Sequence, residues 1–253
     1  MPVVITRPAR DGQRWVEQLR ARGIPAQALP LLAIGPAPDA EALCLARDTV
    51  ADHAGVMFVS ANAVQGFFGP GPLAWPANTR AWAPGPGTAE ALREQGLPAA
   101  AIAASAADAA QFDSENLWKV VAGQLRAGDR LLLVRGADET GRSQGREWLA
   151  GMLAAAGVRV DVVSAYSRGV PAWTPGQRQL AAHAAGAGSV WLFSSSQAAG
   201  NLRLLAPDTA WERAKAIATH PRIAQAVRAL GFGDVRECRP GFADVIASIE
   251  STR

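Results

Sequence analysis

Residues 56–64 read Val-Met-Phe-Val-Ser-Ala-Asn-Ala-Val, and this stretch decides how the rest of the chain is interpreted. An apolar run stops at Ser60 and then resumes as an alanine-rich helical pattern. Such a change is typical of a buried strand, a tight turn and the start of a helix. The turn presents free backbone N–H groups and hydroxyls at the carboxyl end of a strand, which is a favourable place for an anion.

A second stretch of the same kind follows at residues 191–199, which read Trp-Leu-Phe-Ser-Ser-Ser-Gln-Ala-Ala. A shift of 135 positions aligns residues 58–96 with 193–231 without a gap. Chance similarity is the alternative in an alanine-rich chain, but a fixed offset across two strand–turn–helix units favours an internal duplication. The matching pairs include Phe58 with Phe193, Ser60 with Ser195, Pro86 with Pro221, Arg93 with Arg228, and Gly96 with Gly231.

Strand patterns alternate with helix patterns throughout the chain. This alternation predicts an α/β fold with two similar, doubly wound parallel-sheet domains and helices on both sheet faces. The strands are expected at residues 3–5, 24–34, 56–59, 80–83, 130–134, 158–165, 190–193, 214–218 and 235–238.

Two segments rich in breakers, 35–38 and 168–175, each follow an extended run. We therefore expect the chain to cross between domains twice. The predicted first domain is formed by residues 1–35 and 169–253, and the predicted second domain by residues 36–168. The strand-end turns of two similar domains can face each other across a cleft, where a ligand is usually found.

Composition narrows the class of protein. Of 253 residues 49% are hydrophobic and 19% are charged, which suits a folded core. No apolar run approaches 18 residues and the N-terminus lacks a signal-peptide pattern, so we expect a cytoplasmic protein without a membrane segment. The two cysteines and three histidines show no metal-binding or redox spacing, so no metal is expected. Without basic clusters, a nucleic-acid partner is disfavoured.

The predicted turns carry the candidate ligand-binding residues. Their hydroxyls and backbone N–H groups suit a carboxylate or a phosphate. Plain helix capping explains any one of them equally well, but their paired occurrence at strand ends favours binding. The glycine-rich turn at 84–88 is neither a P-loop nor a dinucleotide fingerprint. The candidates are Ser60, Ala61, Asn62, Gly87 and Thr88 in the first repeat, and Ser194, Ser195, Ser196 and Gln197 in the second.

Three further side chains could take part in chemistry. Tyr166, the only tyrosine, sits at the second crossing, where its hydroxyl could serve as a proton donor. An amphipathic residue at a strand end is the alternative. Arg7 and Arg135 end equivalent strands and could bind a substrate carboxylate or make structural salt bridges.

Taken in order, these pieces make the chain similar to uroporphyrinogen-III synthase, the HemD family. The resemblance covers essentially the whole chain. The matching pieces are Ile5-Thr6-Arg7-Pro8, residues 58–64, Gly87-Thr88-Ala89-Glu90-Ala91-Leu92, Ser114-Glu115-Asn116-Leu117, Val134-Arg135-Gly136, Tyr166-Ser167-Arg168, Phe193-Ser194-Ser195-Ser196 and residues 226–232.

The resemblance implies two flavodoxin-like domains joined by a two-stranded connector. It also implies a monomeric, cofactor-free lyase acting on hydroxymethylbilane, a linear tetrapyrrole with eight carboxylates. Such an enzyme closes the ring with loss of water and inverts the last pyrrole, through a spiro intermediate. The family tyrosine maps onto Tyr166 and the family threonine onto Thr88. In the second repeat Ile223 stands where the family pattern has threonine, which leaves backbone N–H groups for binding there.

A different class of function stays open from the residues alone. Two similar domains with anion-favouring turns also suit a non-catalytic binder of a small polyanionic ligand. Protection against thermal unfolding without turnover distinguishes such a binder from the enzyme.

Overall fold

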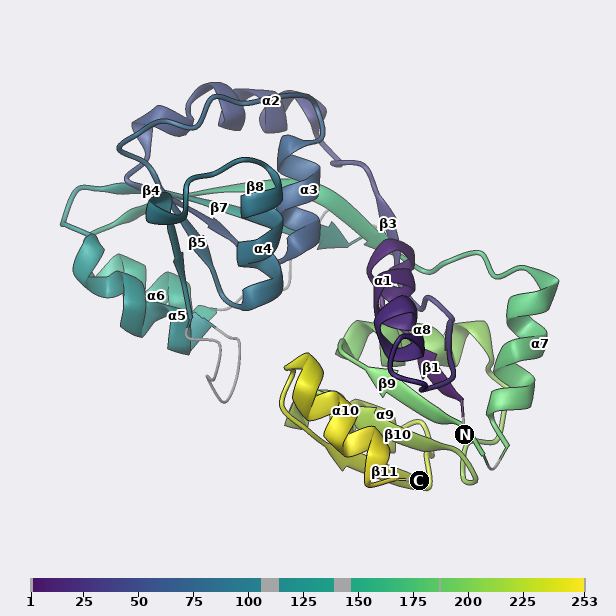
Figure 1. Ribbon diagram of the computed structural model, residues 1–253. Helices are drawn as coiled ribbons and strands as arrows, with labels where there is room; N and C mark the ends of the chain where they lie inside the picture. The colour runs from purple at the N-terminus through teal and green to yellow at the C-terminus, as the bar shows by residue number, and fades with distance from the viewer. Residues whose placement is uncertain (1, 106–113, 139–146, 187, 253) are drawn as a thin grey trace. The chain divides into compact units, whose positions relative to one another are not determined.

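The computed structural model describes residues 2–105, 114–138, 147–186 and 188–252. The chain divides into two compact units (Figure 1). Unit 1 comprises Met1–Ala33 and Gly169–Arg253, and unit 2 comprises Ile34–Arg168. The chain thus passes from unit 1 to unit 2 after Ala33 and returns after Arg168, whereas the sequence analysis expected these crossings after residues 35 and 168.

Unit 1 contains a five-stranded sheet in the order β11-β10-β9-β1-β2, and all four of its strand pairings are parallel. Helices α1 and α10 pack on one face, while α7, α8 and α9 pack on the other. Its strands are β1 (Val3–Ile5), β2 (Ala26–Ala28), β9 (Val190–Phe193), β10 (Lys215–Ala218) and β11 (Asp234–Glu237). Its helices are α1 (Ala9–Arg20), α7 (Pro175–Ala184), α8 (Ser196–Leu205), α9 (Pro221–Arg228) and α10 (Phe242–Glu250).

Unit 2 contains a six-stranded sheet in the order β3-β8-β7-β4-β5-β6, in which β8, β7, β4, β5 and β6 run parallel. Helices α3 and α4 cover one face and α5 and α6 the other (Figure 1). Its strands are β3 (Ala33–Gly35), β4 (Gly55–Phe58), β5 (Arg80–Ala83), β6 (Ile102–Ala104), β7 (Arg130–Asp138) and β8 (Arg159–Gly169). Its helices are α2 (Ala40–Asp48), α3 (Ala61–Phe68), α4 (Pro86–Glu94), α5 (Ser114–Val121) and α6 (Glu147–Ala155), and three 3₁₀ turns lie at Val50–Asp52, Ala99–Ala101 and Ala122–Gln124.

The structure corrects the predicted strands in four places. The extended run at 24–34 is two short strands, β2 and β3, which pair in different sheets. Strands β7 and β8 each continue four residues beyond their predicted ends, to Asp138 and Gly169. Strand β6 was not predicted, because an alanine-rich segment carries no strand propensity and is extended here only through pairing with β5.

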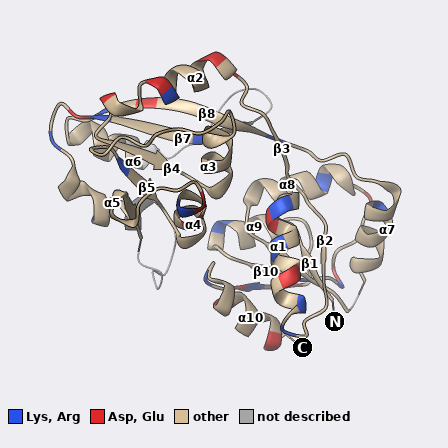
Figure 2. Cartoon of the chain, turned by 45° about the horizontal axis from the view of Figure 1, so that its top comes forward, with Lys and Arg blue, Asp and Glu red and all other residues tan. Residues whose placement is uncertain are grey.

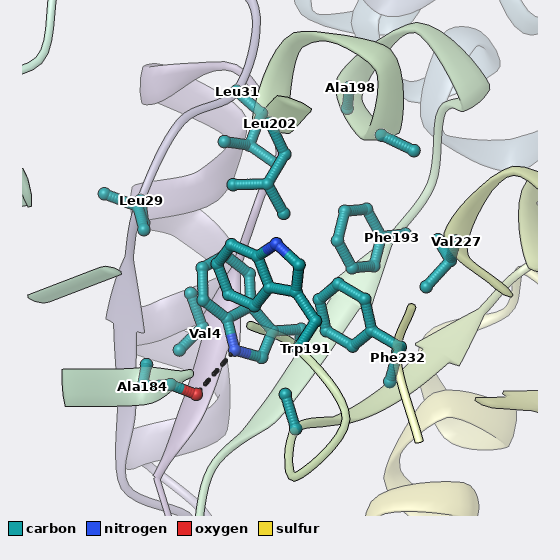
Figure 3. Packing of buried hydrophobic residues seen from close by; sticks show 14 of the residues in the cluster. Val4, Leu29, Leu31, Ala184, Trp191, Phe193, Ala198, Leu202, Val227 and Phe232 are labelled. Carbon is teal, nitrogen blue, oxygen red and sulfur yellow. Dashed lines mark hydrogen bonds between the residues drawn. The ribbon is translucent and has the colours of Figure 1, made fainter. Parts of the chain in front are cut away.

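The core of unit 1 is built around Trp191 on the central strand β9. This indole is fully buried, and Figure 3 shows it surrounded by Val4, Phe193 and Leu202. Its Nε1–H donates to the Ala184 carbonyl at 2.9 Å, which satisfies the one polar atom of the ring (Figure 3). Strands buried on both faces explain why the sequence shows continuous apolar runs rather than alternation.

Charged side chains of both signs are interspersed along the helices. Figure 2 shows basic and acidic residues together on α1, for example. Helix α2 likewise carries both Glu41 and Arg47. None of the helices in the described part of the chain combines the length and the apolar character that crossing a membrane requires.

Candidate active site

Four strands of unit 2 bring candidate residues to one edge of the sheet. Strands β4, β5, β7 and β8 are parallel, so their carboxyl ends lie at the same edge. Ser60 follows β4, and the turn that contains Gly87 and Thr88 follows β5. Tyr166 lies in the last part of β8, opposite Gly136 of β7. This edge is therefore the candidate active site of unit 2.

Ser60 links the start of α3 to Tyr166. As the N-cap of α3, its Oγ accepts a hydrogen bond from the Ala63 N–H at 3.2 Å. The same Oγ lies 3.1 Å from the Tyr166 Oη, and either oxygen can donate. Ser60 therefore caps the helix, as one interpretation of the sequence predicted. It also contacts the Tyr166 hydroxyl, which no local sequence pattern predicted.

A change of register between β7 and β8 directs the Tyr166 side chain. Arg135 pairs with Ser164, whereas Gly136 pairs with Tyr166, so Ala165 is an extra residue on β8. Side chains alternate along a regular strand, yet both Ala165 and Tyr166 lie in the core beneath α3 and α4. The bulge thus turns Tyr166 to the same face as Ser60.

Glycine makes room for the tyrosine ring. A Cβ on Gly136 would lie 2.6 Å from Cε2 and 2.8 Å from Cε1 of Tyr166. The phenol ring consequently rests directly on the β7 backbone. Tyr166 is 6% exposed, so this surface and the core beside it hold the ring on several sides.

The turn before α4 offers backbone donors to a ligand. Its N-cap is Gly85, which has no side chain to accept from the helix, and Pro86 at the first position has no N–H. The Thr88 N–H donates to the Gly85 carbonyl at 3.1 Å, so the Gly87 N–H is the donor that this turn offers to a ligand. The space beside Gly87 is open, since a Cβ there would meet no atom within 4 Å. Thr88 is the third residue of α4 and is buried, while Ala61 and Asn62 begin α3 half-buried. These turns have the donors that a carboxylate requires.

Arg135 and Tyr166 lie on opposite faces of the sheet. Val134 packs beneath α3 and α4, whereas Leu133 packs against the core on the side of α5 and α6. Alternation therefore directs Arg135 to the second face. Burial lowers the pKa of Arg135, and its Nε has no hydrogen-bond partner among the described residues. The structure does not place this guanidinium beside the phenol.

Unit 1 repeats the turn without a tyrosine. Ser195 is the N-cap of α8, and its Oγ accepts a hydrogen bond from the Ala198 N–H at 3.4 Å. Ser194 and Gln197 are half-buried, and Ser196 is exposed. At the next turn the N-cap of α9 is His220, whose Nδ1 accepts from the Arg222 N–H at 3.1 Å.

Arg7 is engaged within its own segment. It forms an ion pair with Asp11, with 2.8 Å between Nη1 and Oδ2, and its guanidinium lies 4.3 Å from the ring centroid of Trp15. These contacts agree with the structural salt bridge that was one interpretation of the sequence. The cleft expected between the two domains stays a prediction.

Sequence reasoning missed three residues near Tyr166. Gly136 and Gly66 were not singled out, although a Cβ on Gly66 would collide with the Ala165 carbonyl. Arg168 lies two positions beyond Tyr166, so the two share a strand face. Its buried Nε has no partner in the part of the chain that the structure describes. The one signal in the sequence was Gly136 itself, because a glycine beside a strand often marks a place where another group approaches the backbone closely.

Histidine, cysteine and acidic side chains in the described ranges form no group of three that could hold a metal ion. What unit 2 presents at this edge is a phenol, two hydroxyls and a set of backbone N–H groups. Such groups bind and orient an anionic organic molecule and can transfer a proton.

Two solved structures with a similar fold are described as uroporphyrinogen III synthases. Uroporphyrinogen-III synthetase from Helicobacter pylori aligns with a TM-score of 0.60 at 14% identity, over 100% of this chain and 99% of that one. A mutant uroporphyrinogen III synthase from Thermus thermophilus aligns with a TM-score of 0.55 at 19% identity, over 100% of this chain and 98% of that one. At these identities the structures establish the fold alone. A search of curated proteins gave no significant match.

The sequence itself supplies the assignment. The family model described as uroporphyrinogen-III synthase HemD matches residues 13–246, which is most of the chain and includes both repeats. The chain therefore belongs to the uroporphyrinogen-III synthase (HemD) family.

Proposed function

We propose that this uroporphyrinogen-III synthase acts as a lyase on hydroxymethylbilane, with Tyr166 as the proton donor to the leaving hydroxyl. The observation that carries the proposal is the position of the Tyr166 hydroxyl. It lies at the carboxyl edge of the unit 2 sheet, 3.1 Å from Ser60. The family match supports the proposed reaction, and the phenol at that edge is the proposed source of the proton.

The enzyme has little covalent chemistry to perform. Protonation lets the hydroxyl of hydroxymethylbilane leave as water, and the carbon left behind is attacked within the same molecule. Unaided closure proceeds without inversion of the last pyrrole. The protein must therefore hold the chain in the shape that favours the inverted closure, which is a task of positioning.

We assign the carboxylates of the substrate to the turns. In unit 2 the Thr88 hydroxyl and the backbone around Gly87 are the proposed ligands, with Ala61 and Asn62 beside them. The Gly87 position is open to a ligand, which supports this assignment. In unit 1 the proposed ligands are Ser194, Ser195, Ser196 and Gln197. Arg7 and Arg135 are weaker candidates, because Arg7 is paired and Arg135 faces away from Tyr166.

The test supplies hydroxymethylbilane and measures the ratio of type III to type I uroporphyrinogen, with an enzyme-free sample as the blank. The proposal expects type III product from the wild type. It expects Tyr166→Phe to lower kcat about 100-fold or more with little change in unfolding temperature, because general acid catalysis contributes factors of that order. Type I product alone would exclude the reaction. Turnover equal to wild type in Tyr166→Phe would remove Tyr166 from the mechanism, and ligand protection without turnover would indicate a binder.

A further inference from the structure

We infer that Ser60 is a positioning residue for Tyr166 and not a ligand of a substrate carboxylate. Through Ser60, the N-terminus of α3 stabilises the charge left on Tyr166 when its proton moves to the substrate. This inference rests on the proposed role of Tyr166. It changes the role that the sequence predicted for Ser60, which was binding at the turn.

The hydrogen bonds around Ser60 have a fixed direction once the proton has left. Ser60 Oγ accepts from the Ala63 N–H, so its own hydrogen is available to Tyr166 Oη 3.1 Å away. A phenolate oxygen can only accept, so Ser60 must then be the donor. The Ala63 N–H belongs to the first turn of α3, where the helix dipole is positive, and it polarises the serine hydroxyl toward the phenolate.

Proton transfer from Tyr166 to the substrate is balanced in atoms and electrons. The O–H bond of Tyr166 breaks and its proton joins the hydroxyl of the hydroxymethyl group. The C–O bond then breaks with its electron pair on oxygen, and water leaves. The substrate carbon becomes cationic and Tyr166 becomes a phenolate held by the Ser60 hydroxyl. The proton that the closed ring loses on rearomatising restores the phenol.

The backbone fixes the ring as well as the hydroxyl. The extra residue Ala165 brings Tyr166 to the face where Ser60 lies, and Gly66 of α3 admits the Ala165 carbonyl. Gly136 lets the ring rest on the neighbouring strand. Two glycines and one bulge therefore position the Tyr166 side chain against Ser60. If Ser60 only bound the substrate, this arrangement would not be needed.

Unit 1 shows what this turn does without a tyrosine. Ser195 caps α8 through the Ala198 N–H, as Ser60 caps α3 through the Ala63 N–H. Capping is thus common to both repeats. The contact with a phenol occurs at Ser60 alone of the two, since the chain has a single tyrosine.

A double-mutant cycle tests the inference, with kcat and KM measured for Ser60→Ala, Tyr166→Phe and the double variant. Ser60→Ala is expected to lower kcat about 10- to 100-fold, the range for a lost hydrogen bond to a charged group, and to change KM less than about twofold. Ser60→Thr retains the hydroxyl and should recover most of kcat. In the Tyr166→Phe background Ser60→Ala should lower kcat no further, because its effect passes through the phenol.

Asp39→Ala is the matched control for the lost cap. Asp39 is the N-cap of α2 in the same unit and accepts from the Ala42 N–H at 2.9 Å, on the surface. It should lower the unfolding temperature about as much as Ser60→Ala does and leave kcat unchanged. Gly136→Ala displaces the Tyr166 ring. It should lower kcat in the wild-type background and have no further effect on kcat in the Tyr166→Phe background.

Three outcomes would overturn the inference. One is a Ser60→Ala variant with raised KM and wild-type kcat, which indicates a substrate ligand. Another is that Tyr166→Phe lowers kcat but the effects of Ser60→Ala and Tyr166→Phe on kcat are additive. This result would leave the proposed function intact and show that Ser60 does not act through Tyr166. The third is wild-type kcat in Tyr166→Phe, which removes the proposed proton donor and this inference together.

Discussion

Thr88 and Ile223 occupy the same position in the two repeats, and both residues are 7% exposed. Each is the third residue of a helix that begins with proline, α4 in unit 2 and α9 in unit 1. Burial at this position is therefore a property of the repeat, and an aliphatic side chain satisfies it. The hydroxyl of Thr88 is not required for packing, which supports a role in binding the substrate.

Replacing Thr88 by valine should separate binding from packing. Valine has nearly the same shape but no hydroxyl, so a lost hydrogen bond to a substrate carboxylate should raise KM about 10- to 100-fold, as one hydrogen bond to a charged group contributes. We expect kcat to change less. Steady-state kinetics with hydroxymethylbilane provide the measurement.

Ile223→Val is the matched control, because it alters the equivalent position without touching a hydroxyl. It removes one buried methylene and should cost about 0.5–1.5 kcal/mol of stability with unchanged KM. If Thr88→Val left KM at the wild-type value, Thr88 would be a packing residue like Ile223.

The turns themselves could be predicted from the sequence. Apolar runs that end at small polar residues indicated helix starts at Ser60 and Ser195. In the structure both residues are N-caps. Local chemistry decides these features, because a cap depends on residues three positions apart. The offset between the repeats likewise depends only on comparing the chain with itself.

The environment of Tyr166 could not be predicted in the same way. The bulge at Ala165 depends on how α3 packs on β8, and no local pattern encodes a shift of register between two parallel strands. The same bulge separates Tyr166 from Arg135, because regular alternation along β8 would have put Tyr166 on the face of Ser164 and Arg135. Local rules failed where packing between distant segments decides side-chain direction.

An acidic group in unit 2 predicts how stability depends on pH. Asp161 accepts hydrogen bonds from Arg130, at 2.8 and 3.1 Å, and from His53 Nε2 at 3.0 Å. Burial raises the pKa of Asp161, but the hydrogen bonds and charges of Arg130 and His53 outweigh it and bring the pKa below the ordinary value of 3.8. The ionised carboxylate therefore stabilises the folded state above about pH 4, and this contribution is lost as the pH falls through the lowered pKa.

Asp161→Asn should accordingly destabilise the protein near neutral pH by a modest amount, since the carboxylate is 45% exposed and screened by solvent. The difference from wild type should shrink below about pH 4, where the carboxylate of the unfolded chain is protonated. Urea midpoints of both proteins, measured from acidic to neutral pH, provide the test. A difference independent of pH would show that the lost contacts are not electrostatic.

The two cysteines should differ in reactivity. Burial, assisted by the charge of Asp244, raises the pKa of the Cys238 thiol to about 11, whereas Cys44 is exposed. At about pH 8 a thiol with this pKa has a thiolate fraction about 100-fold smaller than a thiol of ordinary pKa, and only the thiolate reacts. A thiol reagent should therefore label one group quickly and a second slowly, and Cys44→Ser should abolish the fast phase. Equal rates at both sites would contradict the buried position of Cys238.

Unit 2 should fold as a separate fragment. Residues 34–168 are continuous in sequence and hold a complete sheet with a core on each face. Because the core contacts of this segment are internal, we expect the isolated fragment to give a single cooperative urea transition by circular dichroism. Gly66→Ala in the fragment should lower the midpoint strongly, since the new Cβ meets the Ala165 carbonyl, whereas Gly87→Ala, which meets open space, should change it little. A fragment without a cooperative transition would mean that unit 2 requires unit 1 in order to fold.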